Sequence, residues 1–305
     1  MRRIGALGLL LICATVGACV FSSRATYSSE SLVPSEKALL WSVKGKGLRQ
    51  PSYVLGTIHL IPKEQFQLSD AIRRVLREVN QVVFEIDLNE VMNGVGLLKV
   101  MPRAFMNGGQ TLRNLLSEEE YVFVREVMSK HSAIPMSMME RMKPLFVGSL
   151  LESQRVEQGD NNLLTSVEVE LYRLARKYRL AVGGLETIEY EIGLFDSIPY
   201  ALQARLLVEQ LRQQNAPKEE FAQMVTLYQQ KDVQAMEAVV RQTLGKDSLV
   251  QEILVYRRNR SWIPTMVQKM HRQPTLFAVG AGHLGGPQGV IALLRQAGYR
   301  VEAVD

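Results

Sequence analysis

The chain is poor in cysteine, histidine and tryptophan: its 305 residues include 2 Cys, 4 His and 2 Trp. Both cysteines, Cys13 and Cys19, lie near the N-terminus, so the rest of the chain has no thiol and can form no disulfide. The sequence also has no repeat of fixed period, and no low-complexity tract follows the N-terminal region. These absences exclude a disulfide scaffold and a repeat architecture.

Charge of one sign is not concentrated anywhere in the chain. The formal net charge is +5, and it falls to +3 when Arg2 and Arg3 are removed, because the first 18 residues contain no acid. The glycine pairs 183–184 and 285–286 lack the spacing and the following Lys-Ser or Lys-Thr of a phosphate-binding loop. We therefore expect neither a nucleic-acid partner nor a bound nucleotide.

The N-terminus has the pattern of an export signal. A basic start, Met1-Arg2-Arg3, precedes an apolar run at 4–16 that is too short for a stable membrane-spanning helix. We predict a signal peptide at 1–18. Its ending, Val16-Gly17-Ala18-Cys19, resembles the lipobox of bacterial lipoproteins, and the alternative is an ordinary signal peptide with an incidental cysteine.

The lipobox reading predicts where the protein lies. Cleavage would leave Cys19 as a lipid-bearing N-terminus, followed by a Ser-rich, flexible and disordered tether at 19–37. Position 20 is Val and not the Asp that retains many lipoproteins at the inner membrane. We therefore expect attachment to the periplasmic face of the outer membrane through this lipid.

Two short motifs of the same form stand more than two hundred residues apart. Each is a Gly-x-x-His sequence that ends an apolar run: Gly56 to His59 follows the run at 53–55, and Gly280 to His283 follows the run at 275–279. Glycine relaxes the backbone where a strand leaves a sheet. Each histidine is therefore expected just beyond a strand end.

A third run, 81–86, ends in two carboxylates, Glu85 and Asp87, that share one face by the period-two rule. A helix with Ser69 as its cap separates this run from the first histidine, so the strands are expected to be parallel and to end at one edge. Glu85 is the candidate ligand, although a strand-ending acid can equally cap a helix or pair with an arginine. Asp87 is as well explained as a turn residue.

The rest of the chain completes an α/β prediction. Runs at 38–43 and 52–57 form an antiparallel pair, a short strand is expected at 180–182, and Pro287 opens a helix before a closing strand at 299–304. The segment from about 88 to 274 is mostly helical, with a capping box at Ser117. We predict one domain, 38–305: a mixed β-sheet with parallel crossovers, flanked by helices, with a large helical insertion in its middle.

Together these features resemble the TraB/PrgY/GumN family, which includes the Tiki proteins. The resemblance rests on the paired Gly-x-x-His motifs, the strand glutamate Glu85, the Gly-Leu-Glu-Thr stretch that contains Glu186, and the pair Arg258-Asn259 upstream of the second histidine. It runs from residue 40 to 305, and it extends more distantly to erythromycin-esterase-like and haem-binding ChaN-like proteins. It implies a metal-dependent, protease-like activity of the kind demonstrated for Tiki members.

The residues and the resemblance together give a candidate site. His59, Glu85 and His283 are the expected metal ligands, and Gly56 and Gly280 shape the loops that deliver them. Arg258 is expected to hold a carboxylate as a bidentate fork, and Asn259 to orient an imidazole. Glu85 and Glu186 are the expected catalytic carboxylates, and either Glu186 or Asp87 would move the proton.

The predicted function is metal-assisted hydrolysis, most simply of a peptide or protein substrate. Two histidines and a carboxylate accommodate Mn, Co, Zn or Fe, and the sequence does not choose among these ions. The first alternative is a binding protein that holds a peptide or a haem-like ligand without turning it over. A purely structural envelope lipoprotein is the third reading, and it gives the histidine motifs no role.

The two remaining histidines and a methionine-rich segment are given structural explanations. His131 and His271 lie in polar segments beside Lys130 and Arg272, so both are expected at the surface. The segment 136–142 contains four Met, and we interpret it as adaptable core and not as a metal or haem site.

Overall fold

The computed structural model describes residues 32–131, 134–158, 164–212, 216–244 and 248–304. The predicted signal peptide, Cys19 and the tether up to residue 31 lie outside these ranges, so the expectations about them stay predictions. Across the described ranges, we find no helix with both the length and the apolar character needed to cross a bilayer.

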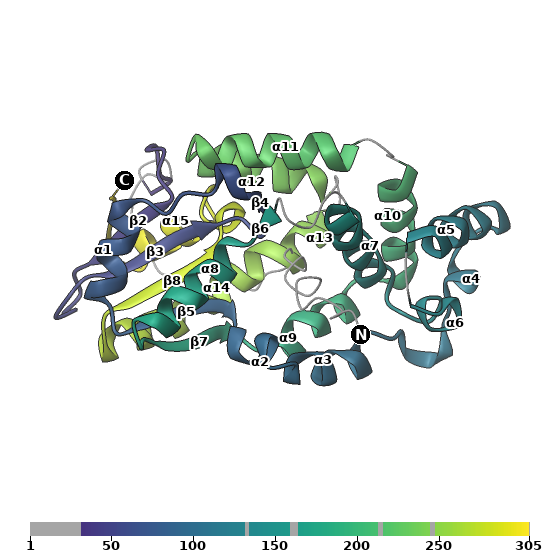
Figure 1. Ribbon diagram of the computed structural model, residues 1–305, viewed down its shortest axis with the longest axis horizontal. Helices are drawn as coiled ribbons and strands as arrows, with labels where there is room; N and C mark the ends of the chain where they lie inside the picture. The colour runs from purple at the N-terminus through teal and green to yellow at the C-terminus, as the bar shows by residue number, and fades with distance from the viewer. Residues whose placement is uncertain (1–31, 132–133, 159–163, 213–215, 245–247, 305) are drawn as a thin grey trace. The chain divides into compact units, whose positions relative to one another are not determined.

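The centre of the fold is a six-stranded mixed sheet with the order β7-β5-β8-β3-β2-β9 (Figure 1). Its strands are β2 (Leu40–Lys44), β3 (Ser52–Thr57), β5 (Gln81–Ile86), β7 (Ala181–Glu186), β8 (Thr275–Gly280) and β9 (Arg300–Ala303). Strands β7, β5, β8 and β3 are parallel, whereas β2 is antiparallel to both β3 and β9. The predicted mixed sheet with parallel crossovers and flanking helices is confirmed.

The described chain divides into two compact units. An α/β unit contains the sheet and consists of residues 32–89, 165–186 and 222–304, and a helical unit consists of residues 90–158, 164 and 187–221. Of the helical middle expected at about 88–274, segments 165–186 and 222–274 belong to the α/β unit. Those segments carry Glu186, Arg258 and Asn259.

The helices of the α/β unit are mostly short. They are η3 (Lys63–Gln65), α1 (Asp70–Glu78), α8 (Val167–Lys177), α12 (Val233–Thr243), α13 (Ser248–Gln251), the π-helical turn η7 (Glu252–Tyr256), α14 (Arg257–Arg272), the 3₁₀ turn η8 (Ala281–His283) and α15 (Val290–Gln296). Helix α8 packs on β5 and β7, and α14 packs on β7 and β8. Two-residue strands β4 (Ile61–Pro62) and β6 (Leu164–Thr165) lie outside the main sheet.

The helical unit is built around α5, α7 and α10, which contact one another. Its helices are α3 (Val95–Val100), η4 (Met101–Arg103), η5 (Asn107–Gly109), α4 (Leu112–Leu115), α5 (Glu118–His131), α6 (Met136–Met139), α7 (Pro144–Gln158), α9 (Ile188–Gly193), η6 (Leu194–Ser197) and α10 (Tyr200–Arg212). Helices α2 (Leu88–Met92) and α11 (Ala216–Gln229) span the junctions between the units. Met139 and Met142 of the methionine-rich segment are buried, as the core interpretation predicts, whereas Met136 is half-buried and Met138 is exposed.

The helix caps and the glycine-rich loop expected from the sequence form as predicted. The Ser69 hydroxyl accepts a hydrogen bond from the Ile72 N–H at the start of α1. At the start of α5, Ser117 N–H donates to the Glu120 carboxylate while Glu120 N–H donates to the Ser117 hydroxyl. The strand pair β2 and β3 is joined by a glycine-rich loop, as predicted.

Two boundaries differ from prediction. The last helix begins at Val290, with Gly289 as its cap, and not at Pro287. The strand expected at 180–182 continues as β7 to Glu186, because its backbone pairs with β5 as far as the pair Ile86 and Glu186. Glu186 therefore ends a strand and does not follow one.

The end of the expected tether lies against the α/β unit. Gln234 on α12 donates to the carbonyl of the buried Pro34, with a nitrogen–oxygen distance of 3.0 Å. Lys37 forms an ion pair of 2.7 Å with Asp232, and Arg295 on α15 donates to the carbonyl of Leu32. Residues 32–37 are therefore fixed to the domain, in contrast to the disorder expected for this part of the tether.

Candidate functional site

The carboxyl ends of four parallel strands meet at one edge of the sheet, where open α/β sheets bind their ligands. His59 follows the end of β3 by two residues, and Glu85 is the last residue but one of β5. Glu186 ends β7, and His283 lies in η8, directly after β8. In the register of β3 and β8, Thr57 is opposite Gly280, so the two Gly-x-x-His motifs leave the sheet side by side. The prediction that His59, Glu85 and His283 lie at one edge of the sheet is confirmed, and Glu186 lies at the same edge.

A buried guanidinium links two of the carboxylates. Arg258 is fully buried on α14, and its NH2 lies 2.6 Å from Glu85 Oε2 and 2.5 Å from Glu186 Oε1. Its Nε donates to the same Glu186 oxygen at 2.7 Å. A buried carboxylate needs such a partner, because an unpaired charge in the interior costs several kcal/mol. Arg258 thus pairs with two carboxylates, whereas the sequence analysis expected it to hold one carboxylate as a bidentate fork.

Glu186 is tied down at both oxygens. Its second oxygen, Oε2, accepts a hydrogen bond of 2.9 Å from the indole N–H of Trp262, which the Arg258 guanidinium also overlies. Burial raises the pKa of Glu186 above its usual range, against the lowering effect of Arg258. Glu186 therefore acts mainly as an anchor for Arg258 and Trp262 in this arrangement.

Glu85 reaches across to β8 and the second histidine. Its Oε1 accepts a hydrogen bond of 2.7 Å from the Gly280 N–H and lies 3.9 Å from His283 Nε2. A Cβ at Gly280 would stand 3.3 Å from this oxygen and 3.6 Å from the imidazole of His283. A side chain at Gly280 would therefore crowd the Glu85 carboxylate, which would have to move by a few tenths of an ångström.

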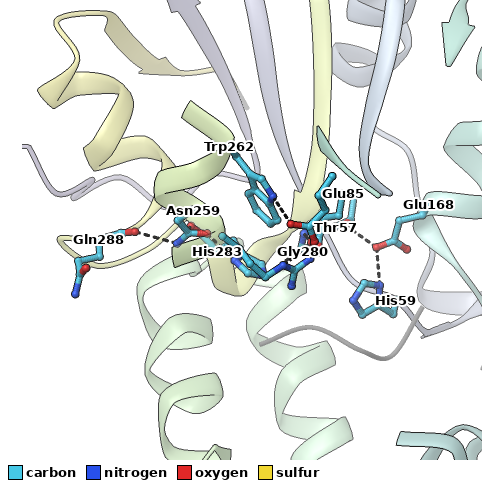
Figure 2. A network of polar contacts seen from close by, with 11 residues as sticks. Thr57, His59, Glu85, Glu168, Asn259, Trp262, Gly280, His283 and Gln288 are labelled. Carbon is cyan, nitrogen blue, oxygen red and sulfur yellow. Dashed lines mark hydrogen bonds and ion pairs between the residues drawn. The ribbon is translucent and has the colours of Figure 1, made fainter. Parts of the chain in front are cut away.

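Asn259, which follows Arg258 on α14, holds the imidazole of His283 (Figure 2). Its Nδ1 lies 2.6 Å from Asn259 Oδ1, and the Asn259 amide donates to the Gln288 carbonyl at 2.9 Å. Because the amide oxygen accepts, Nδ1 carries the proton and Nε2 faces Glu85 with its lone pair. Burial is the main cause that lowers the pKa of His283 to about 4, so the imidazole is neutral at pH 7.

His59 has a different partner, which the sequence analysis did not identify. Its Nδ1 lies 2.9 Å from Oε1 of Glu168, a residue in the first turn of α8. Thr57 Oγ1 donates to the same oxygen at 2.7 Å, and Ser166 Oγ donates to Oε2 at 3.0 Å. Burial alone would raise the pKa of Glu168, but the nearby His59 and the hydrogen bonds from His59 and Thr57 hold this pKa below its usual range. The only feature of the sequence that could have indicated Glu168 is its position between two apolar residues, Val167 and Val169.

The first motif glycine, Gly56, is required by packing. A Cβ at this position would lie 2.9 Å from Leu284 Cδ1 and 3.0 Å from the Cβ of Ala281. Both neighbours belong to the loop that carries His283. Gly56 therefore lets the second motif pack directly on the strand that leads to the first.

The other predicted residues are placed as follows. Asp87 accepts hydrogen bonds from the backbone and side chain of Asn89, so it caps the next turn and does not join the buried network. His271 is exposed and lies 3.2 Å from the Tyr299 hydroxyl, which confirms the expected surface position. His131 is the last residue of α5.

The described side chains do not form a ready-made metal cage. Glu85 and His283 lie together, whereas His59 is paired with Glu168, and no three His, Cys, Asp or Glu side chains of the described chain gather closely enough to hold an ion. The charges of Glu85 and Glu186 exceed that of Arg258 by one, so a cation or a proton would be stabilised beside them. The arrangement offers two imidazoles and a carboxylate at one sheet edge.

These features define an α/β protein with a histidine and carboxylate site at the carboxyl edge of its sheet. Residues 39–303 match the model of the TraB/PrgY/gumN family, and the chain belongs to this family.

The curated relatives of the chain are called metalloproteases. It is 24% identical over 323 residues to Metalloprotease TIKI2 of Danio rerio, covering 87% of this chain and 60% of that protein. It is 21% identical over 319 residues to Metalloprotease TIKI1 of the same organism, covering 87% of this chain and 63% of that protein. This chain thus spans about three fifths of the length of these relatives. No solved structure matches it.

Proposed function

We propose that this protein is a metal-dependent hydrolase of the peptidase type, with His59, Glu85 and His283 as the residues that hold the ion. The observation that carries the proposal is the way both imidazoles are fixed. An oxygen lies beside Nδ1 of each ring, Glu168 Oε1 at 2.9 Å from His59 as an ion pair and Asn259 Oδ1 at 2.6 Å from His283 as a hydrogen bond, which leaves Nε2 of each ring to act as a ligand. The family relatives named metalloproteases support the same reading.

The chemistry of the donors fits a divalent ion. Neutral imidazole and carboxylate are ligands of Mn, Co and Zn alike, and burial keeps His283 neutral at physiological pH. An ion bound there would polarise a substrate carbonyl and lower the pKa of a water molecule.

The residues around the site have separate tasks in this proposal. Arg258 fixes the orientation of Glu85, and Glu186 and Trp262 hold Arg258 in place. The Trp262 ring also packs on the imidazole of His283, with ring centroids 4.8 Å apart, and thereby keeps water from that side of the ring. Glu186 is the candidate for proton transfer, because burial raises its pKa.

A second candidate function is ligand binding without turnover. It is favoured by one observation: Glu85 already accepts hydrogen bonds from Arg258 and Gly280, so its charge is largely neutralised. In that case the same sheet edge would bind a peptide or a haem-like ligand, and Glu85 would serve only to order the loop.

Activity on peptides separates the two candidates. The purified protein is incubated with a peptide library without metal and with added Mn, Co or Zn. We expect cleavage that requires a metal and is lost in Glu85→Gln, while the surface variant His271→Ala cleaves like the parent. Binding of peptides with no cleavage under any of these metals would favour the binding protein and contradict the hydrolase.

We also propose that the protein is an exported lipoprotein whose Cys19 carries the lipid, facing the periplasm from the outer membrane. The support is the N-terminal pattern, a basic start, an apolar run and small residues before a cysteine. A peptide or protein substrate in that compartment fits a peptidase-type site.

A further inference from the structure

We propose that Glu168 is the positioning residue of His59, which fixes the proton on Nδ1 and so dedicates Nε2 to the ligand. The assignment of a metal ion to Nε2 rests on the proposed function, whereas the assignment of the proton to Nδ1 does not. No motif in the sequence pointed to Glu168, because it lies in a helical segment far from both histidine motifs.

The chemistry of the contact between Glu168 and His59 supports this role. An ionised carboxylate has only acceptor oxygens, so a ring nitrogen that lies 2.9 Å from one of them as an ion-pair contact is stabilised when it carries a hydrogen. If Nδ1 of a neutral His59 bore a lone pair instead, two electron-rich atoms would face each other at this distance. The contact therefore selects the tautomer with the proton on Nδ1 and the lone pair on Nε2.

The second argument is the depth and connectivity of the carboxylate. The Glu168 side chain is 5% exposed and the His59 side chain 22% exposed, so the acid is buried and the imidazole partly open. Thr57 at the end of β3 and Ser166, the N-cap of α8, donate hydrogen bonds to Glu168, and His59, two residues beyond β3, lies in ion-pair contact with it. An apolar side chain would fill this space at lower cost if packing were the only requirement.

The third argument is the parallel with the other histidine. His283 Nδ1 is held by the amide oxygen of Asn259, which itself is fixed by its bond to the Gln288 carbonyl. Figure 2 shows the two imidazoles anchored by these separate partners, one from α14 and one from α8. Histidine ligands of metals are oriented in this way through the ring nitrogen that does not bind the ion.

The direct test is the tautomer of His59 in the metal-free protein. The full chain is labelled with ¹⁵N at histidine, and long-range proton–nitrogen spectra are recorded as a function of pH, with signals assigned by replacing each histidine in turn. We expect the neutral form of His59 to be protonated at Nδ1. A neutral His59 protonated at Nε2 would overturn the proposal, and this measurement needs no variant of Glu168.

Substitutions test whether Glu168 is the cause. Glu168→Leu removes both acceptor oxygens, so the Nδ1 preference should disappear. Glu168→Gln retains one oxygen that can accept from His59 and Thr57, so it should restore the preference. The control is Glu170→Gln on the same helix, because Glu170 pairs at the surface with Arg173 and should leave His59 unchanged. A Leu variant that keeps the parent tautomer would overturn the role of Glu168.

Ion binding provides the second readout, with Co²⁺ as the probe because its visible spectrum reports histidine ligation. Loss of a residue that orients a ligand typically weakens metal binding by about 10–100-fold. We expect a loss of that size for Glu168→Leu, a smaller one for Glu168→Gln, and none for Glu170→Gln. Parent-like Co²⁺ affinity in the Leu variant would overturn the positioning role. A parent that binds no metal would refute the proposed function, while the tautomer measurement would still decide the role of Glu168.

Discussion

At the scale of single residues, the site depends on one buried guanidinium that pairs with two carboxylates. Arg258→Met would leave Glu85 and Glu186 buried without a countercharge. Removing one partner from a buried ion pair costs about 3–5 kcal/mol, so we expect a loss of this size in the free energy of unfolding. Urea denaturation followed by circular dichroism measures it.

The matched control for this variant is Arg173→Met on α8. Arg173 is 64% exposed and pairs with Glu170, so its loss should change the free energy of unfolding by less than about 1 kcal/mol. Equal effects of the two substitutions would contradict the importance of the buried network.

The buried histidine predicts how stability depends on pH. The pKa of His283 is lowered by burial from 6.5 to about 4, so in acid the unfolded chain binds a proton at this site that the folded chain does not bind. The contribution of this difference to the free energy of unfolding is complete above pH 6.5. It falls by up to about 3 kcal/mol as the pH drops toward 4, because each tenfold difference in proton affinity corresponds to about 1.36 kcal/mol.

Urea unfolding of the metal-free protein at several pH values between 7 and 4 measures this dependence. His283→Gln should remove most of the slope between pH 6.5 and about 4, whereas the exposed His271→Gln should keep it. Glu168, whose pKa is lowered, contributes in a more acidic window, below the ordinary carboxyl value of 4.5. A slope unchanged in the His283 variant would contradict the burial of a neutral imidazole.

At the scale of elements, the two histidine loops pack through a glycine. Gly56→Ala would place a Cβ 2.9 Å from Leu284 Cδ1, and overpacking of this kind costs about 1–3 kcal/mol. Chemical denaturation should show that loss. The Gly56→Ala, Leu284→Ala double variant should lose less stability than the two single variants together, because the smaller side chain relieves the clash.

Gly193→Ala is the control for this prediction. Gly193 ends helix α9 with ordinary helical dihedrals, and the nearest atom to an added Cβ is 3.9 Å away. It should be neutral or slightly stabilising, because alanine favours the helix. Additive losses in the double variant would show that β3 and η8 are not coupled through Gly56.

The elements also show what the sequence could predict. The apolar runs that became β3, β5 and β8, and the Ser69 cap of α1, were readable because period and caps are local properties. The position of β8 between β3 and β5 could not be predicted, because the pattern of a strand does not indicate which strands lie beside it. Glu168 was missed for a similar reason, because only the packing of α8 beside β5 brings it to His59.

At the scale of the whole molecule, the proposed lipid anchor at Cys19 predicts attachment to a membrane. Cys19→Ser removes the atom that would carry the lipid, so we expect the variant to lose its association with membranes. Fractionation of cells expressing the parent and the variant measures this. A variant that is processed and sediments with membranes as the parent does would show that the lipid anchor is wrong.

The central claim is that His59, Glu85 and His283 together hold a metal ion. The most direct measurement is the metal content of the protein after loading with Mn, Co or Zn and dialysis, with thermal melts recorded with and without the ion. An ion that binds only the folded state must raise the melting temperature. The parent and His271→Ala should retain metal and melt higher with it, while His59→Ala, Glu85→Ala and His283→Ala should lose both effects. A parent that retains none of these ions, or His59 and His283 variants that keep the full metal-dependent rise, would contradict the account.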